Sequence, residues 1–275
     1  MIQPIKLRDW IDIQKINWKL LSSNPNAMNL LEKNSEKISW YWLSLNSNAI
    51  HLLEQNPNKI DWNSLSENPN AIHILEKNLD KINWTYLSKN PNAIHILEKN
   101  PDKINWYLLL SSNPNAIHLL EKNQDKINWS NLSSNPNAID LLEKNQDKIN
   151  WYSLSLNPNA IHLLEKNLDK IDWNLLSFNK NAIHLLKKNP DKINWYNLSE
   201  NPNAIYLLEK NPDKISWYSL SLNPSIFTYD YENMKEKMKE SGLAEELAEK
   251  VFHPIRLMKL CEQYGLELQE LQEIY

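Results

Sequence analysis

The sequence predicts an all-α solenoid, and three observations support this. A block of about 22 residues, with the consensus NPNAIHLLEKNxDKINWxxLSx, is repeated nine times without interruption between Asn24 and Leu222. Each block carries start and stop signals for two short helices, and each of these helices has one apolar face. A block of this size cannot bury its apolar faces alone, so neighbouring units must stack into a continuous core.

The units have a nearly constant length: eight span 22 residues and the fourth spans 23. The extra residue in the fourth unit predicts a local bulge or a lengthened turn. Residues 15–23 match the second half of a unit, so we interpret residues 1–23 as an N-terminal cap that contains a half-repeat. The nine full units begin at Asn24, Asn46, Asn68, Asn90, Asn113, Asn135, Asn157, Asn179 and Asn201.

The first helix of each unit is predicted to begin at Asn-Pro. Asn is a favoured N-cap, and Pro suits the first helical position because an N–H group has no helical partner there. The segment Glu-Lys-Asn is predicted to close the helix, with Asn in the left-handed conformation that Gly commonly adopts at helix ends. The chain has only two Gly, so Asn must take this position.

The second helix is predicted to begin at the residue before Trp in the segment Ile-x-Trp-x-x-Leu. In eight units, Ile before this N-cap and Leu four residues after it have the spacing of a hydrophobic staple, as Ile82 and Leu87 do. Two independent signals thus predict the same helix start. The predicted N-caps are Ser39, Asp61, Asn83, Asn105, Asn128, Asn150, Asp172, Asn194 and Ser216.

The stacking of these helices predicts a curved rod. Helices pack about 8 to 10 Å apart, so nine layers with caps predict a rod on the order of 90 Å long with a concave surface. After Leu222 the period is lost, and residues 226–275 are predicted to form three or four longer helices. We interpret residues 24–222 as the repeat domain and residues 223–275 as a C-terminal helical capping region, with a separate binding module as the alternative.

Composition and residue usage exclude several classes of protein. The sequence has no apolar run of the roughly 18 residues that a membrane span requires. The single Cys261 cannot form an internal disulfide, which favours a reducing compartment. Two Gly leave no Gly-rich phosphate loop, and Cys261 lacks the sequence context of a nucleophile. We therefore predict no enzyme, no catalytic residue and no cofactor.

The repeat also resembles a known class. The unit Asn-Pro-Asn-Ala-Ile-x-Leu-Leu-Glu-Lys-Asn, followed by Lys-Ile-x-Trp-x-x-Leu-Ser, is similar to short repeats in uncharacterised proteins of giant nucleocytoplasmic large DNA viruses, which are mimivirus-like. The segments 227–231 and 253–256 resemble the region that closes such proteins. The resemblance covers nearly the whole chain and implies a viral origin and a repeat class, but no established chemistry.

One position of the first helix carries a column of histidines. A metal site needs several ligands about 2 to 2.5 Å from one ion, whereas successive layers hold these rings roughly 10 Å apart. The sequence therefore predicts no metal site. A structural role is favoured, because nearly every His precedes a Glu by three positions on the same helix, Lys187 being the exception. The column comprises His51, His73, His95, His118, His162 and His184, with Asn29, Asp140 and Tyr206 at the same position elsewhere.

The outer face of the second helix varies most between units and is the predicted partner-binding surface. Aromatic groups mixed with small polar groups on a rigid scaffold are typical of adaptable contact surfaces. The alternative is that these side chains only cover gaps between layers. The predicted partner-binding residues are Tyr41, Trp42, Tyr86, Tyr107, Tyr152, Phe178, Tyr196 and Tyr218.

Two other functions compete with protein binding. Aromatic rows on helical repeats stack bases in some nucleic-acid-binding proteins, but each unit here carries Glu, Lys, Asp and Lys, which leaves no basic stripe. A structural or assembly component of a virus particle or factory, with self-association, is the second alternative. Our prediction is a non-enzymatic scaffold that binds a host or viral protein, located in the cytoplasm of an infected cell or in the virion.

Overall fold

The computed structural model describes residues 5–107 and 110–242. One compact unit spans Leu7–Phe227, and a second comprises Met1–Lys6 with Thr228–Tyr275. Every repeat except the fourth contributes a first helix, a 3₁₀ turn and a second helix, which confirms the predicted all-α repeat solenoid. The compact unit extends beyond the predicted repeat domain at both ends.

The helices follow the predicted alternation. The first helices are α2 (Met28–Glu32), α4 (Ile50–Gln55), α6 (Ile72–Glu76), α8 (Ile94–Lys99), α9 (Ile117–Glu121), α11 (Ile139–Glu143), α13 (Ile161–Glu165), α15 (Ile183–Lys188) and α17 (Ile205–Glu209). The second helices are α1 (Trp18–Leu21), α3 (Trp40–Leu45), α5 (Trp62–Glu67), α7 (Trp84–Leu87), α10 (Trp129–Ser133), α12 (Trp151–Leu154), α14 (Trp173–Leu176), α16 (Trp195–Glu200) and α18 (Trp217–Leu220).

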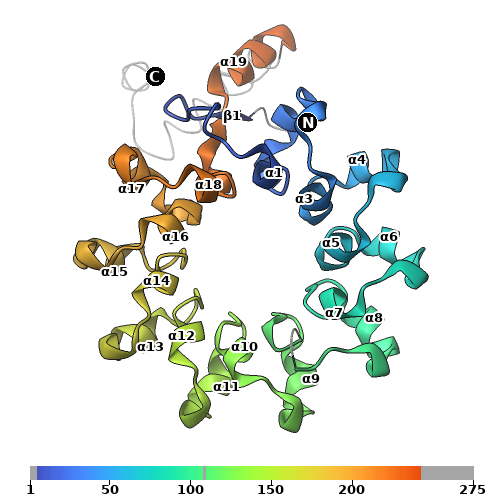
Figure 1. Cartoon of the computed structure of the whole chain (residues 1–275), viewed down its shortest axis with the longest axis vertical. Helices are drawn as coiled ribbons and strands as arrows, with labels where there is room; N and C mark the ends of the chain where they lie inside the picture. Colours follow the sequence, from blue (N-terminus) through green and yellow to red (C-terminus); the bar gives the residue numbers. More distant parts are fainter. Residues whose placement is uncertain (1–4, 108–109, 243–275) are drawn as a thin grey trace, which may run out of the picture. The chain divides into compact units, whose positions relative to one another are not determined.

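Residues 7–227 form a closed ring rather than the predicted open rod (Figure 1). The two ends of the array are held together by hydrogen bonds, among them the bond from the Arg8 N–H to the Ile226 carbonyl at 2.9 Å. Asn223-Pro224 supplies the start of a tenth unit, and residues 15–23 supply its second half. The ends of the stack thus cover each other.

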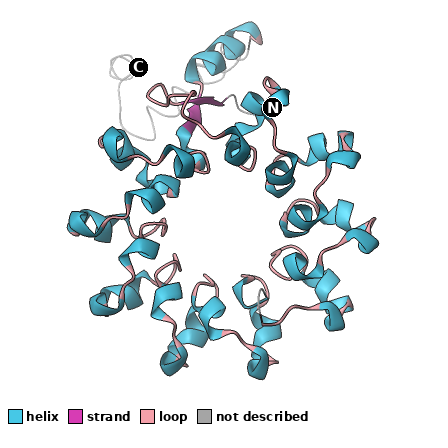
Figure 2. Cartoon of the chain, in the orientation of Figure 1, coloured by secondary structure: helices cyan, strands magenta, loops and turns pink. Residues whose placement is uncertain are grey.

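The second helices line the inner side of this ring and the first helices lie outside them (Figure 2). Consecutive second helices contact one another, as α3 does with α5 and α5 with α7. Each first helix contacts the 3₁₀ turn of its own unit, as α4 does with Pro57–Lys59. The outer layer holds two elements per unit and the inner layer holds one, so each unit is wider on the outside and has the shape of a wedge. Ten wedges close a full turn when each contributes about 36°, one tenth of 360°.

The core lies between the two helix layers. One Leu of the second helix and the Ala and last Leu of the first helix segment are fully buried in unit after unit, as Leu65, Ala71 and Leu75 are. These residues belong to one continuous cluster that runs from Ile11 to Phe227. The core therefore has no separate end that a cap would need to cover.

Several local predictions are corrected by the structure. In most units the first helix begins at Ile, four residues after the predicted Asn N-cap, as α4 does at Ile50. In the first and ninth units, a 3₁₀ helix begins at the Pro after Asn24 or Asn201 and leads into the α-helix, so these two Asn are N-caps as predicted. Asn at its end is not left-handed: Asn78 has φ −138°, and among the described residues only Gly242 has a positive φ. The Asn78 side chain instead donates to the Ile74 carbonyl at 2.8 Å, which caps the helix.

The N-caps of the second helices match the prediction more closely. The side chains of Asp61, Asn83, Asn128, Asn150, Asp172, Asn194 and Ser216 accept bonds from the first turn, whereas Ser39 makes no such bond. The fourth unit departs from the pattern, since the residues described on either side of 108–109 form a turn at Trp106 and a 3₁₀ helix at Leu110–Ser112.

The chain ends contain strands that the sequence did not predict. Strands β1 (Ile5–Leu7) and β2 (Phe227–Tyr229) form a two-stranded sheet. The predicted helical stretch therefore begins only at α19 (Tyr231–Glu240). The remaining predicted C-terminal helices lie in residues 243–275, outside the described residues.

Candidate functional site: the ring and its inner surface

Ten buried asparagines form a continuous hydrogen-bonded ladder around the ring. The Asn46 Nδ2 donates to the carbonyls of Ser22 and Asn24 in the preceding unit, at 3.0 and 2.9 Å. Its Oδ1 accepts from the Asn48 N–H, which fixes the turn before the first helix. The same pattern recurs at Asn24, Asn68, Asn90, Asn113, Asn135, Asn157, Asn179, Asn201 and Asn223.

A second set of bonds runs through the serine after the buried Leu. The Ser44 hydroxyl donates to the Trp40 carbonyl at 2.8 Å and accepts from the Asp61 N–H of the next unit at 3.1 Å. This hydroxyl thus bonds a backbone carbonyl of one second helix and the backbone N–H of the N-cap residue of the next second helix. The sequence patterns predicted Asn only as a helix cap and gave this Ser no role, so neither set of bonds was predicted.

The junction between the chain ends repeats these bonds. The Asn24 Nδ2 donates to the carbonyls of Ser221 and Asn223, at 3.2 and 3.0 Å. The Asn17 N–H donates to the Ser221 hydroxyl at 2.8 Å, and the Asn26 side chain donates to the Pro224 carbonyl at 3.0 Å. We call these contacts the closure junction. It has the same hydrogen-bonded register as the internal junctions.

The closure junction also has contacts of its own. The Arg8 Nε donates to the Ser225 carbonyl at 2.8 Å, and the guanidinium lies 5.4 Å from the ring centre of Tyr206. Tyr206 occupies the position that His takes in six other units. Lys15 lies 5.1 Å from the Trp217 ring, just as Lys37 lies over Trp18 at 4.2 Å in the next layer. Such cation–π contacts contribute about 0.5 to 1 kcal/mol at exposed sites.

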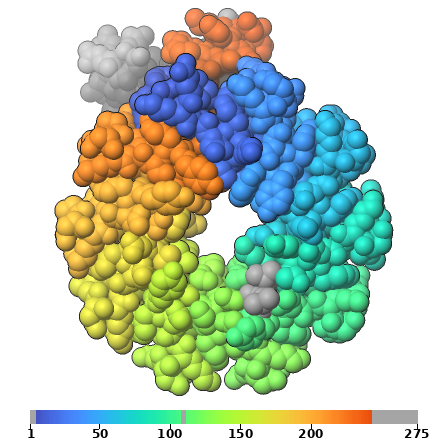
Figure 3. Space-filling model, in the orientation of Figure 1, coloured from blue at the N-terminus to red at the C-terminus, as the bar shows by residue number. Residues whose placement is uncertain are grey.

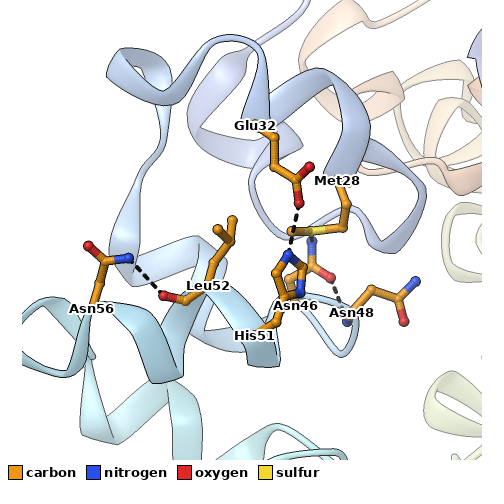
Figure 4. A network of polar contacts seen from close by, with 7 residues as sticks. All are labelled: Met28, Glu32, Asn46, Asn48, His51, Leu52 and Asn56. Carbon is orange, nitrogen blue, oxygen red and sulfur yellow. Dashed lines mark hydrogen bonds and ion pairs between the residues drawn. The ribbon is translucent and has the colours of Figure 1, made fainter.

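The histidine column makes contacts between units, not the predicted pairs within one helix. The His51 Nε2 lies 2.8 Å from the Glu32 Oε1 of the preceding unit, beside Asn46 and Asn48 of the ladder (Figure 4). The other five histidines pair in the same way at 2.9 to 3.0 Å. These pairs lie on the first helices and are about half exposed. Each pair adds a polar contact between neighbouring layers, and the structural role of the column stays a prediction.

The predicted partner-binding residues other than Tyr107 belong to the second helices or the turns that follow them, and thus to the inner layer of the ring. Tyr107 lies in the turn at Trp106 of the fourth unit. The tyrosines are 41% to 70% exposed, with Tyr86 the lowest and Tyr107 the highest. Trp42 and Phe178 are half-buried. The prediction that this face binds a partner stays a prediction.

Helix geometry directs this face toward the centre of the ring. At 100° per residue, positions one, two and five after the Trp lie opposite the buried Leu and Ser at positions three and four. The buried positions face the first helices, which lie outside, so positions one, two and five of the second helix face the centre of the ring. The space-filling view shows the central opening (Figure 3). Consistently, Leu45, Leu156 and Phe178 are half-buried but do not pack against the core cluster.

The inner surface is chemically divided. The division is clearest at the fifth position after the Trp. Around the ring from the unit of Tyr152 to that of Tyr41, this position is large and apolar in four of six units, the exceptions being Glu200 and Ser23, and Leu175 and Trp42 add apolar groups at position two. We call these apolar residues the apolar arc. From the unit of Asn63 to that of Ser130, the residues at positions one, two and five are mostly polar, and we call them the polar arc. The apolar arc comprises Trp42, Leu45, Leu156, Leu175, Phe178 and Leu222; the polar arc comprises Asn63, Glu67, Thr85, Lys89, Ser130, Asn131 and Ser134, with Tyr86 and Tyr107 beside them.

A carboxylate lies among the residues of the apolar arc. Glu200 occupies the fifth position in its unit, between Phe178 and Leu222 in the neighbouring units. Burial raises its pKa above the ordinary value of 4.5. No hydrogen bond or ion pair joins its carboxylate to another described residue, whereas Glu67 at the same position of an earlier unit is paired with Lys89. Glu200 is therefore a half-buried acid without a cation.

Replacing Glu200 by Gln is expected to stabilise the protein at pH 7. The ionised carboxylate is disfavoured in the folded state, so wild-type stability falls as the pH rises from about 4.5 through the raised folded pKa. The gain from Glu200→Gln should be a few tenths to about 1 kcal/mol at pH 7 and should shrink toward pH 4. Thermal unfolding followed by circular dichroism at both pH values measures it. An equal gain at both pH values would contradict this cause.

No protein-family model, curated protein or solved structure matches the chain. The resemblance to giant-virus repeats therefore stays a prediction. Within residues 5–107 and 110–242, no helix has the length and apolar character needed to cross a membrane. In the same residues, no three His, Cys, Asp or Glu side chains are grouped so that they would hold a metal ion.

Proposed function

We propose that this protein is a non-enzymatic scaffold that binds a polypeptide partner at the inner surface of its ring. The observation that carries the proposal is the placement of the exposed tyrosines on the inner helices of a closed structure. Tyr and Trp offer large contact areas at a low cost in conformational entropy. The ladders hold the inner helices in fixed register, so the surface is organised before a partner arrives.

The size of the opening suits a polypeptide segment. Ten inner layers spaced by about 8 to 10 Å give a circumference of roughly 80 to 100 Å, and therefore a radius of roughly 13 to 16 Å to the helix axes. Subtracting a helix radius of about 5 Å leaves an opening about 20 Å across. A single α-helix, about 10 to 12 Å in diameter, fits within it.

The charge of the inner surface disfavours nucleic acid. Lys19 and Lys89 are balanced by Glu67 and Glu200 at the positions that face the opening. Phosphate binding depends on concentrated Lys or Arg, and its affinity follows the number of neutralised phosphates. A balanced lining with aromatic and small polar groups is better suited to a protein. The viral origin and the cytoplasmic or virion location remain proposals that rest on the resemblance alone.

Affinity capture tests the proposal. Wild-type protein and the double variant Tyr152→Glu, Tyr196→Glu are used to capture proteins from nuclease-treated host-cell lysate, and the retained proteins are identified by mass spectrometry. A partner retained by wild type is then purified, and its affinity for both proteins is measured. We expect the double variant to bind at least about tenfold more weakly, because charges replace two aromatic contacts.

A control variant shows whether a loss of affinity comes from the inner surface or from any added surface charge. Leu168→Glu adds a charge at an apolar side chain that is 52% exposed in the 3₁₀ turn Leu168–Lys170 of the outer layer, and it should leave the affinity unchanged. Helical content by circular dichroism should be the same in all variants. Equal binding by wild type and the double variant would rule out the inner surface as the binding site.

A further inference from the structure

We propose that the partner segment is an amphipathic α-helix whose apolar face packs on the apolar arc and carries one basic residue opposite Glu200. This inference rests on the proposed function and specifies its partner. An amphipathic helix that lays its apolar face against an apolar surface is a recurrent mode of peptide recognition. Three features of the inner surface point to this occupant.

The first feature is the division of the lining into two arcs. A symmetric or extended ligand would meet unlike chemistry on its two sides, whereas an amphipathic helix presents an apolar side to one arc and a polar side to the other. Leu156, Phe178 and Leu222 occupy the same position of their units on the apolar arc. They are half-buried without contributing to the core, so they offer apolar area to a partner.

The second feature is the size of the opening relative to a helix. An opening about 20 Å across exceeds the diameter of a helix, about 10 to 12 Å, by several ångströms. One helix therefore rests on a single arc and does not contact the whole lining. Water and polar side chains fill the space on the other side, which matches the polar arc around Thr85 and Ser134.

The third feature is Glu200. Its carboxylate is half-buried between Phe178 and Leu222 and has no cationic partner among the described residues. A Lys or Arg on the partner helix would supply the missing cation, as Lys89 does for Glu67. Lys19 is exposed two layers away across the closure junction and would repel a second basic residue there. The charge pattern thus selects for one basic residue at a defined place.

The apolar arc is complete only in the closed ring. Leu156, Phe178 and Leu222 come from the C-terminal part of the array, and Trp42 and Leu45 from its N-terminal part. The closure junction lies between them. A helix that contacts both parts binds the closed ring better than an opened one, so binding and closure stabilise each other.

Synthetic peptides test the inference without a known partner. The probe is a fluorescein-labelled peptide of about 18 residues, roughly five helical turns, with Leu and Ala on one face, Gln and Glu on the other, and one Lys within the Leu face. A second peptide carries Gln in place of that Lys. A third has the composition of the first but a scrambled order that forms no apolar face. Fluorescence anisotropy with the full-length protein gives the three affinities.

We expect the Lys peptide to bind at least about tenfold more tightly than the scrambled peptide. The double variant Leu156→Asn, Phe178→Asn should weaken its binding about tenfold, whereas the matched polar-arc variant Thr85→Asn, Ser134→Asn should not. Glu200→Gln should weaken the Lys peptide about threefold to tenfold and leave the Gln peptide unchanged. Circular dichroism spectra confirm that each variant is folded.

Several results would overturn the inference. Equal binding of the scrambled peptide, equal loss in the polar-arc variant, or an equal effect of Glu200→Gln on both helical peptides would each do so. If the Lys peptide does not bind but a captured partner still depends on Tyr152 and Tyr196, the ring binds another kind of polypeptide and the proposed function stands. If neither binds at the inner surface, both proposals fall.

Discussion

Replacing Asn24 by alanine is expected to lower the free energy of unfolding by about 2 to 4 kcal/mol. Asn24 is 1% exposed, and its side chain satisfies the carbonyls of Ser221 and Asn223 and the N–H of Asn26. Alanine would leave these groups without their partner, and each unsatisfied buried group costs about 1 to 3 kcal/mol. Urea denaturation followed by circular dichroism measures the loss.

The informative comparison is with the same substitution inside the array. Asn135 is fully buried and makes the same bonds to Ser111, Asn113 and Asn137 at an internal junction. In a closed ring, Asn24→Ala and Asn135→Ala should cost similar amounts. If the ends were apart in solution, Asn24 would bond only its own turn, and its substitution would cost far less than that of Asn135. Such a difference would contradict the closure junction.

The sequence predicted the elements well because their signals are local. An N-cap such as Asn83 and a staple such as Ile82 with Leu87 depend on residues a few positions apart, and the structure contains both the cap and the helix. The Leu of this staple, the third residue after the Trp, is fully buried in the core, as Leu87 is. Local propensity and packing agree in nearly every unit, which is the condition under which sequence patterns predict structure reliably.

The ladders could have been predicted from one signal that the sequence contains. Ser47 and Lys180 replace Pro in two units, yet Asn46 and Asn179 before them are kept. A cap that only starts a helix tolerates Ser or Asp, as the second helices show at Ser39 and Asp61. Only Asn combines one acceptor with two donors at this size. The absence of any replacement in ten units therefore indicates a buried amide with all its bonds used.

The ring itself was harder to predict, because curvature is a sum of small differences. Closure depends on whether each layer turns by about 36° or by a few degrees less, and no helix propensity specifies such an angle. The one available signal is that the array begins with the second half of a unit and ends, at Asn223-Pro224, with the start of one. Two complementary halves at opposite ends of a repeat array make a tenth unit only if the ends meet.

The histidine pairs illustrate a related limit. His51 and Glu54 lie three residues apart on one helix, which predicts a local pair. The structure joins His51 to Glu32 instead, at 2.8 Å. The separation between helices in neighbouring layers is set by core packing, and this separation is not visible within one unit. The residues of the inner surface could be listed from the sequence because they vary from unit to unit. That they face the centre of a ring could not be predicted, because this depends on how the units are arranged.

Deleting one complete unit is expected to prevent closure. Removal of residues 135–156 joins Ser134 to Asn157 and preserves every remaining unit and internal junction in sequence. The nine layers that remain would each have to turn by about 40°, one ninth of 360°, in place of about 36°. Close-packed interfaces resist such changes, because side chains already fill the space between layers. The deletion should therefore leave the two end faces unpaired.

The consequence distinguishes a ring from an open solenoid. In an open solenoid, the loss of one unit removes only its own stability and one interface, and the protein stays monomeric. In the ring, the unpaired faces around Asn24 and Asn223 expose buried amide and carbonyl groups that fit the opposite face of a second copy. We expect oligomers whose mass rises with concentration, measured by light scattering after size-exclusion chromatography, and a larger radius of gyration per chain by X-ray scattering. A compact monomer as stable as the wild type would contradict this prediction. It would show that nine layers can also close a ring by changing the angle between them.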